Sequence, residues 1–144
     1  MTDWIVGLHT FSTVAMAGLI WFVQVVHYPL MARVGSEAFA TYEAEHVRRT
    51  TWVVAPLMLV ELATALWLVL VLAAPGHGWV PAVGVLLLAV IWGSTVVIQV
   101  PIHRRLQEGF ERAALTRLER TNWVRTLGWT LRAILAVYLS VLHR

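Results

Sequence analysis

The sequence predicts an all-α, polytopic membrane protein: a four-helix bundle built from two repeated helical hairpins. Of the 144 residues, 59% are hydrophobic and only 13% are charged, whereas a soluble domain is roughly 45–50% apolar and about 25% charged. Four apolar stretches are each long enough to cross a hydrocarbon core of roughly 30 Å as a helix. The two halves of the chain also share short matching segments. We therefore assign residues 1–144 to a single transmembrane domain.

The four predicted spans follow one another with unequal connections. They run from about Ile5 to Val26, from Trp52 to Ala73, from Trp79 to Ile102 and from Trp123 to Leu142. The leader 1–3 lacks the positive charge of a cleavable signal peptide, so we expect the first span to be retained. Five residues, 74–78, join spans two and three. Pro29, Pro56 and Pro101 are expected to kink their helices or to mark where they leave the core.

The two other connections, 27–51 and 103–122, are long and are predicted to be largely helical. Ser36 is a residue type that caps helices and precedes a polar stretch with a spacing of three to four residues, which predicts a helix beginning at Glu37. Helices two and four are therefore expected to extend below the membrane before they enter it.

Arginine is the basic residue throughout, and its distribution predicts the orientation. Nine of the eleven arginines lie on one side of the predicted membrane or at its boundary: Arg33, Arg48, Arg49, Arg104, Arg105, Arg112, Arg117, Arg120 and Arg125. The positive-inside rule places that side in the cytoplasm and both termini outside. We expect a multi-pass protein of a bacterial-type inner (plasma) membrane. Without a basic arm or a soluble module, the net charge of +3 does not indicate nucleic-acid binding. The hydrophobic composition predicts the lipid bilayer as the partner.

Matching segments in the two halves predict an internal repeat. Arg49–Val53 matches Arg120–Val124 at a shift of 71, and Gly18 with Gln24–Val25 matches Gly93 with Gln99–Val100 at a shift of 75. We therefore predict hairpin 4–73 and hairpin 79–143, which form a parallel repeat with its pseudo-twofold axis along the membrane normal.

Two ionisable residues fall inside the predicted spans, Glu61 and Arg132, and the shift of 71 relates them. An ionisable group at mid-bilayer costs at least about 2.5–3.5 kcal/mol, so such groups normally face the bundle interior and pair. One interpretation is a structural ion pair between spans two and four. The other is a role in a substrate or proton pathway.

Polar side chains gather where the four spans reach the cytoplasmic side. They are Gln24 and His27 on span one, Glu43, Glu45 and His46 before span two, Gln99 and His103 on span three, and Asn122 and Arg125 on span four. Because residues three or four apart share a helix face, we expect these groups to converge at one depth.

The Glu-x-x-His pair formed by Glu43 and His46 is the unit from which carboxylate metal sites in helical bundles are built. It occurs once, which predicts a mononuclear site with His27, Glu43, His46 and His103 as ligands, suited to iron, copper or zinc. A haem b with His27 and His103 as axial ligands is the second alternative. In the third, there is no cofactor and the histidines are amphipathic side chains at the interface. The chain has no cysteine, so thiolate ligands are excluded.

Several of these residues also resemble a known family. The run Gly18–Leu30 ending in His27-Tyr28-Pro29-Leu30, then Phe39, Val100-Pro101-Ile102 with Arg105-Leu106, and finally Trp123 and Arg132, is similar to the anthrone-oxygenase-like family of small four-span membrane proteins. The resemblance covers most of the chain. It implies oxygen-dependent chemistry on a lipophilic or aromatic substrate, such as the oxygenation of anthrones to quinones. The chain departs from that family by carrying His27, His46 and His103 together, which favours a metal-dependent version of the activity.

We therefore predict an integral membrane oxidoreductase or oxygenase that acts on a lipophilic small molecule in a cytoplasmic-side pocket. The candidate catalytic residues are Glu45, which would ligate or shuttle protons, Asn122, and Arg125, which would orient an anionic or phenolic oxygen. The alternative function is a non-enzymatic transport or binding protein. In that case the chain forms a homo-oligomer around a polar path through Glu61 and Arg132.

Overall fold

The computed structural model describes residues 2–72 and 78–143, and within those ranges the chain is helical apart from short turns. It forms four long rods. The first rod consists of α1 (Thr2–Phe22), the π-helical turn η1 (Val23–His27) and α2 (Tyr28–Met31), and the second is α3 (Ser36–Val71). The third rod consists of α4 (Trp79–Ser94), the π-helical turn η2 (Thr95–Gln99) and α5 (Val100–Leu106), and the fourth is α6 (Arg112–Leu142).

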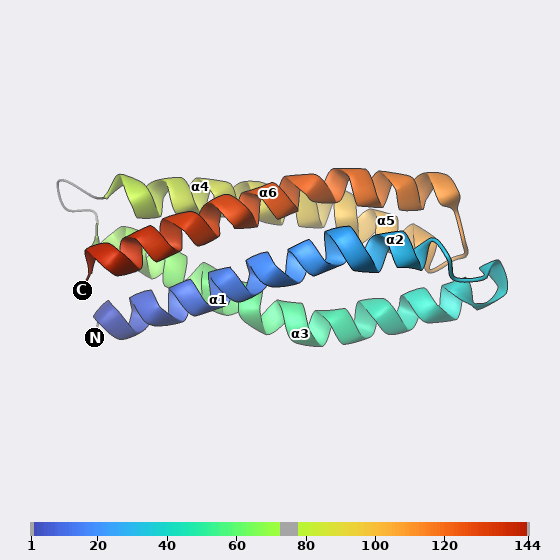
Figure 1. Cartoon of the computed structure of the whole chain (residues 1–144), viewed down its shortest axis with the longest axis horizontal. Helices are drawn as coiled ribbons and strands as arrows, with labels where there is room; N and C mark the ends of the chain where they lie inside the picture. The colour runs from blue at the N-terminus through green and yellow to red at the C-terminus, as the bar shows by residue number, and fades with distance from the viewer. Residues whose placement is uncertain (1, 73–77, 144) are drawn as a thin grey trace.

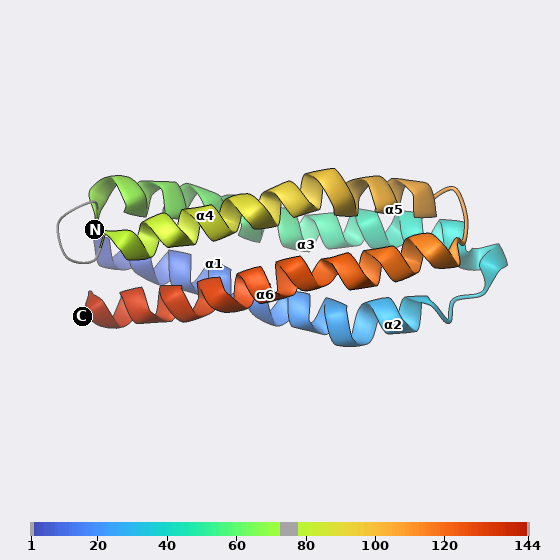
Figure 2. The ribbon, with the colours of Figure 1, turned by 90° about the horizontal axis from the view of Figure 1, so that it is seen from above.

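The four rods lie side by side as an up-down-up-down bundle (Figure 1). Helix α1 packs against α3 and α6, and α4 packs against the same two helices. Consequently α1 and α4 occupy opposite corners of the bundle, and so do α3 and α6. Helix α1 begins and α6 ends at one end of the bundle, whereas the connections 32–35 and 107–111 lie at the other (Figure 2). The all-α four-helix bundle is confirmed, while the internal repeat and the membrane orientation stay predictions.

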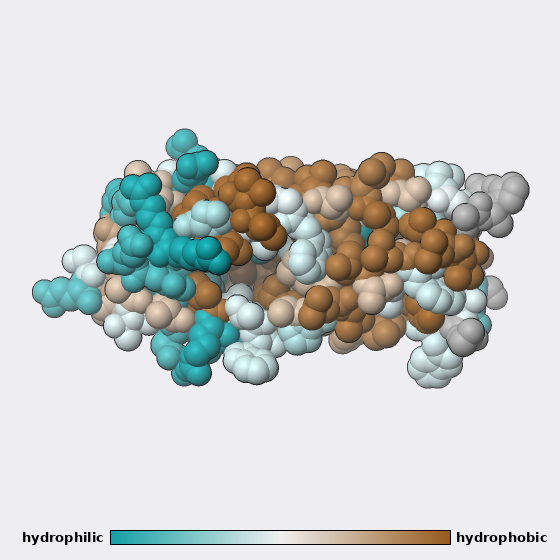
Figure 3. Space-filling model, turned by 180° about the vertical axis from the view of Figure 1, so that it is seen from behind, coloured by the Kyte–Doolittle hydropathy of each residue, from teal (hydrophilic) through white to brown (hydrophobic). Residues whose placement is uncertain are grey.

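Each rod is long and apolar enough to cross a membrane. Large apolar side chains cover the outside of the bundle, among them Leu70, Leu86 and Val97, which are more than half exposed. Figure 3 shows this hydrophobic body next to a hydrophilic end. Leaving such a surface in water costs about 25 cal/mol for each Å², so the outside of the bundle is suited to lipid. The chain is therefore a membrane protein by length and surface composition.

Helices α3 and α6 begin well before the apolar segments that were predicted to start at Trp52 and Trp123. The predicted cap at Ser36 is wrong. Gly35 is the extended residue before the helix, and Ser36 is already helical, with no side-chain hydrogen bond at this end. Because Ser36 lies inside the first turn, its hydroxyl is not placed to accept from the free N–H groups that follow.

A π-helical turn precedes a proline in both the first and the third rod. Pro29 and Pro101 lack an N–H and would clash with the carbonyl four residues earlier in an α-helix. The wider turn avoids this clash, since the residue before each proline donates its N–H to the carbonyl five residues back. The two π turns begin 72 residues apart, at Val23 and Thr95. Their spacing therefore differs from the shift of 75 that was predicted for this part of the internal repeat. Pro56 lies within an uninterrupted α3.

Close packing between α4 and α6 depends on Gly128. A Cβ atom added there would lie 2.8 Å from Cγ1 and 3.1 Å from Cδ1 of Ile91, which is fully buried. At Gly18 and Gly93, in contrast, an added Cβ atom would meet nothing within 4 Å. The close approach of helices that small residues allow in membranes is therefore located at Gly128.

We expect Gly128→Ala to lower the free energy of unfolding. Overpacking a buried site costs about 1–3 kcal/mol, which exceeds the gain of about 1 kcal/mol from replacing glycine by alanine in a helix. Gly93→Ala is the matched control and should leave stability unchanged or raise it. Thermal unfolding of the detergent-solubilised variants checks this. Equal melting temperatures for the two variants would contradict the packing role of Gly128.

Candidate functional site

Three ionisable side chains from two rods meet near the hydrophilic end of the bundle. Glu43 and His46 come from the same face of α3, and His103 comes from α5. One ligand atom of each lies within 4.8 Å of the others. Glu43 is fully buried and the two histidines are half-buried. We call these three residues the triad.

His103 is held at both ring nitrogens. Its Nδ1 lies 2.5 Å from Oε1 of Glu43, and its Nε2 lies 3.3 Å from the hydroxyl of Tyr28, which follows η1. The second carboxylate oxygen of Glu43, Oε2, is buried and has no hydrogen-bond partner among the described residues. An unsatisfied buried acceptor costs about 1–3 kcal/mol, so the triad has one strong acceptor left for a proton or a cation.

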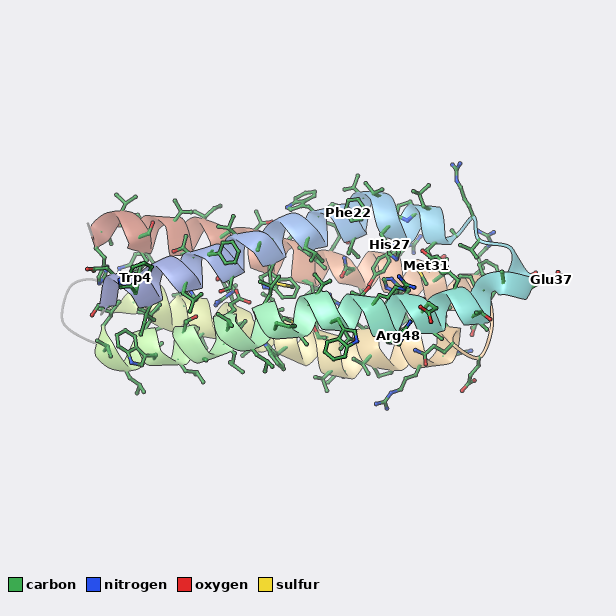
Figure 4. The ribbon with its side chains drawn as sticks, turned by 90° about the horizontal axis from the view of Figure 1, so that it is seen from below. Trp4, Phe22, His27, Met31, Glu37 and Arg48 are labelled. Atoms are coloured by element: carbon green, nitrogen blue, oxygen red, sulfur yellow. The ribbon has the colours of Figure 1, made fainter. Side chains whose placement is uncertain are left out.

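His27 lies beside the triad rather than in it. Its ring stacks on that of His46, with 4.2 Å between the ring centroids and 22° between the planes. The ring of Tyr42 lies beside both, with its centroid 6.3 Å from that of His27 and 6.5 Å from that of His46. Figure 4 shows His27 near α3, far from Trp4 at the other end of the bundle. The Nε2 atom of His27 is buried without a hydrogen-bond partner in the described structure.

His46 lies in the polar part of α3, before the apolar span that begins at Trp52. Its Nδ1 is 3.2 Å from the hydroxyl of Thr50, one turn further along the helix, which leaves Nε2 as the free ring nitrogen. Burial, together with the neighbouring imidazoles of His27 and His103, lowers the pKa of His46 to about 3. Its ring is therefore neutral at physiological pH, and neutral imidazole is the form that binds metal ions.

A cavity of about 630 Å³ adjoins the triad, within the range of about 300–1,000 Å³ typical of small-molecule sites. Its walls are mostly apolar side chains of α1, α3, α4 and η2, and its polar lining includes Tyr28, His46, Gln99, His103 and Arg125. The hollow is visible near the boundary between the hydrophilic end and the hydrophobic body (Figure 3). His46 and His103 of the triad thus line a cavity suited to a lipophilic molecule.

Arg125 of α6 lines this cavity without a counter-charge. Its side chain is 9% exposed and lies over Trp129, with 5.5 Å from Cζ to the ring centroid. Its Nε atom has no hydrogen-bond partner, and no carboxylate within residues 2–72 or 78–143 forms an ion pair with it. The sequence analysis predicted Arg125 as a pocket residue, and in the structure Arg125 lines this cavity.

The structure does not bring Glu45 to the triad. Its carboxylate is 2.7 Å from Arg48 and 2.9 Å from Arg49 on the exposed side of α3. Successive residues of an α-helix are about 100° apart, so Glu45 lies nearly opposite Glu43 on the helix. This geometry gives no support to the predicted ligand or proton-shuttle role of Glu45.

Asn122 is buried in a polar contact next to the site but does not line the cavity. Its Nδ2 donates to Oε1 of Gln24 at 2.9 Å, and Nε2 of Gln24 donates to the backbone carbonyl of Glu119 at 3.1 Å. These bonds join η1 to α6. The observed contacts of Asn122 are therefore structural, and they position the first rod from which His27 and Tyr28 project.

Glu61 and Arg132 meet in the centre of the bundle. Nε of Arg132 donates to Oε1 of Glu61 at 2.8 Å, and Nε1 of Trp129 donates to Oε2 at 2.9 Å. A second Arg132 nitrogen donates to the backbone carbonyl of Gly84. The adjoining cavity of about 20 Å³ has room for about one water molecule. These contacts favour the structural ion pair over a polar path through a single chain.

Tyr28 and Trp129 are site residues that the sequence analysis missed. In a regular α-helix, Tyr28 would point about 100° away from its neighbour His27. The two side chains indeed contact different rods: His27 stacks on His46 of α3, and Tyr28 contacts His103 of α5. The hydroxyl-bearing aromatic residue directly before Pro29 is the sequence signal that points to Tyr28.

No protein-family model, curated protein or solved structure matches the chain. The resemblance to the anthrone-oxygenase-like family therefore stays a prediction.

We expect Glu61→Gln to lower the free energy of unfolding by about 3–5 kcal/mol, because it leaves the buried Arg132 charge without compensation. The double variant Glu61→Met with Arg132→Met should recover most of this loss, since it removes both charges and keeps the volume. Unfolding in detergent micelles measures both. If the double variant is less stable than the single one, the pair has a role beyond charge compensation.

Proposed function

We propose that the protein is an integral membrane oxidoreductase that uses a transition metal ion, bound by Glu43, His46 and His103, to oxidise a lipophilic or aromatic substrate with dioxygen. The observation that supports this is the triad of two imidazoles and one carboxylate, whose two imidazoles line the large apolar cavity. Two histidines and one carboxylate with open coordination positions are the ligand set of non-haem iron oxygenases.

The hydrogen bonds around the triad fit such an ion. In the ion-free protein a proton lies between Nδ1 of His103 and Oε1 of Glu43, and a cation replaces that proton on binding. Nε2 of His103 then carries the hydrogen and donates it to the Tyr28 oxygen, which lies 3.3 Å away. Thr50 accepts from Nδ1 of His46 in the same way. Such outer contacts orient ligating histidines.

In this proposal the side chains that line the cavity bind and orient the substrate. Once the oxygen of Tyr28 accepts a hydrogen bond from His103, its own hydroxyl hydrogen is free to donate to a substrate oxygen in the cavity. The bound ion would supply the activation of dioxygen. Oxidation of a methylene group to a carbonyl by one dioxygen, with release of one water, balances without a further reductant. This is the type of reaction that the family resemblance implies.

The ring arrangement favours a metal ion over haem b. The His46 ring lies 4.2 Å from the His27 ring and 5.6 Å from the His103 ring, measured between centroids. A porphyrin bound axially by His27 and His103 would have to displace His46 from between them. Binding of a metal ion requires only that side chains already gathered within 4.8 Å exchange a proton for the cation.

The orientation proposed for the chain rests on its arginines. Exposed arginines, among them Arg48, Arg49 and Arg105, lie at the end that carries the connections 32–35 and 107–111. We propose that this end faces the cytoplasm of a bacterial-type inner membrane, as the positive-inside rule requires. The triad then lies on the cytoplasmic side and the cavity opens at the level of the apolar body.

Metal analysis of protein purified without chelators tests the proposed function. We expect about one iron or copper ion per chain, because zinc has no redox chemistry, and binding weakened at least about tenfold in Glu43→Gln and in His103→Gln. Glu45→Gln is the matched control, because it removes an exposed carboxylate two positions from Glu43, and it should keep the ion. Background metal content in the wild-type protein, or equal content in all variants, would sink the proposal.

Labelling of single introduced cysteines checks the orientation. Because the chain has no native cysteine, each introduced cysteine is the only residue that a maleimide can label. In inside-out vesicles a membrane-impermeant maleimide should label Ser36→Cys and spare Thr2→Cys, with the reverse result in right-side-out spheroplasts. The opposite labelling pattern would overturn the proposed sidedness without affecting the triad.

A further inference from the structure

Arg125 is buried yet forms no ion pair within the described residues, unlike the arginines whose carboxylate partners the structure shows. Arg132, two turns further along α6, pairs with Glu61, while Arg48 and Arg49 share the carboxylate of Glu45. Arg105 pairs with Glu111. Arg125 is buried and faces the cavity with no such partner in the described chain.

The surroundings of Arg125 do not compensate its charge. A guanidinium group stays protonated in proteins, so burial cannot be relieved by loss of the proton. The Trp129 ring contributes a cation–π contact, which is weaker than the cost of taking a cation out of water. Neither buried acid of the described chain forms an ion pair with Arg125: Glu43 contacts His103, and Glu61 contacts Arg132 and Trp129. An anion from outside the chain would complete the site.

The lining of the cavity indicates what the remainder of such an anionic ligand would be. Beside Arg125 its walls include Met16, Ile20, Met58 and Trp92, which favour an apolar body. Leu59 and Val96, which belong to the second and third rods, line the cavity and are both 58% exposed. The opening between these rods therefore lies within the apolar surface, and a ligand can enter from the lipid.

We propose that the cavity binds an apolar molecule with a single carboxylate, whose two oxygens accept hydrogen bonds from the Arg125 guanidinium. The planar fork of a guanidinium matches a carboxylate with two parallel hydrogen bonds. Arg104 lies at the exposed rim of the cavity, so Arg125 is the buried cation of the lining, which suits one negative charge. This inference names the substrate class of the proposed function and rests on that function, but the binding itself needs no metal ion.

Equilibrium binding of radiolabelled dodecanoate to the protein in nanodiscs, with metal removed by a chelator and empty nanodiscs as background, tests the proposal. We expect the wild-type protein to bind dodecanoate at least about tenfold more tightly than dodecanol, as a charge-assisted pair requires. Arg125→Gln should lose this preference and Arg125→Lys should keep part of it. Arg117→Gln is the matched control, since it removes an exposed arginine of the same helix.

Stability supplies a second readout that separates a binding role from a structural one. Without ligand, Arg125→Met should be as stable as the wild-type protein or more stable, because it removes an uncompensated buried charge. Dodecanoate should raise the melting temperature of the wild-type protein and not that of the variant. A less stable ligand-free variant, or equal binding of dodecanoate by wild-type protein and Arg125→Gln, would overturn the proposal.

Failure of this inference is distinguishable from failure of the proposed function. Glu43→Gln should lose the metal ion and keep the preference for dodecanoate over dodecanol, whereas Arg125→Gln should keep the ion and lose the preference. If Arg125→Gln keeps both, the carboxylate site is wrong and the metal site stands. If wild-type protein binds dodecanoate but no metal, the oxidoreductase proposal fails and the binding site remains.

Discussion

The ion pair of Glu61 and Arg132 is the contact on which the arrangement of the bundle depends. It joins α3 to α6, which occupy opposite corners and do not pack directly on each other. In an apolar medium neither charge can turn to water instead, so each helix has one rotation and one height at which the pair forms. Glu43 is 18 residues, five full helical turns, from Glu61 and therefore faces inward as well. On α6 the same restraint turns Arg125 toward the bundle interior.

The π turns place the remaining site residues around α3. Both rods that flank this helix carry a proline near the hydrophilic end, and each proline is preceded by a wider turn that a regular α-helix would not contain. His27, the last residue of η1, stacks on His46, and His103, beyond η2, contacts Glu43. The site is thus assembled from one uninterrupted helix, which carries two triad residues, and two rods with π turns, which supply the others.

The two buried arginines of α6 illustrate how structural and functional charges differ. Two nitrogens of Arg132, Nε and Nη1, donate to acceptors supplied by α3 and α4, and the cavity beside it is small. Arg125 contacts the face of the Trp129 ring but forms no ion pair with a carboxylate of the described chain, and it borders a cavity that is large and mostly apolar. A buried charge that is paired within the chain fixes how its helices fit together, whereas a buried charge without such a partner is available to a ligand.

The sequence by itself determined the four apolar helices, their polar extensions, and the shared face of Glu43 and His46, because hydropathy and the helical period act along a single helix. It also predicted that Glu61 and Arg132 lie at equal depth. Helical spacing also accounts for the contacts of Glu45 with Arg48 and Arg49. Only the tertiary structure decided that Asn122 binds Gln24 and that Tyr28 joins His103. These outcomes depend on how each rod is rotated about its own axis. Packing between rods and the π turns set that rotation, and spacing along one helix does not encode it.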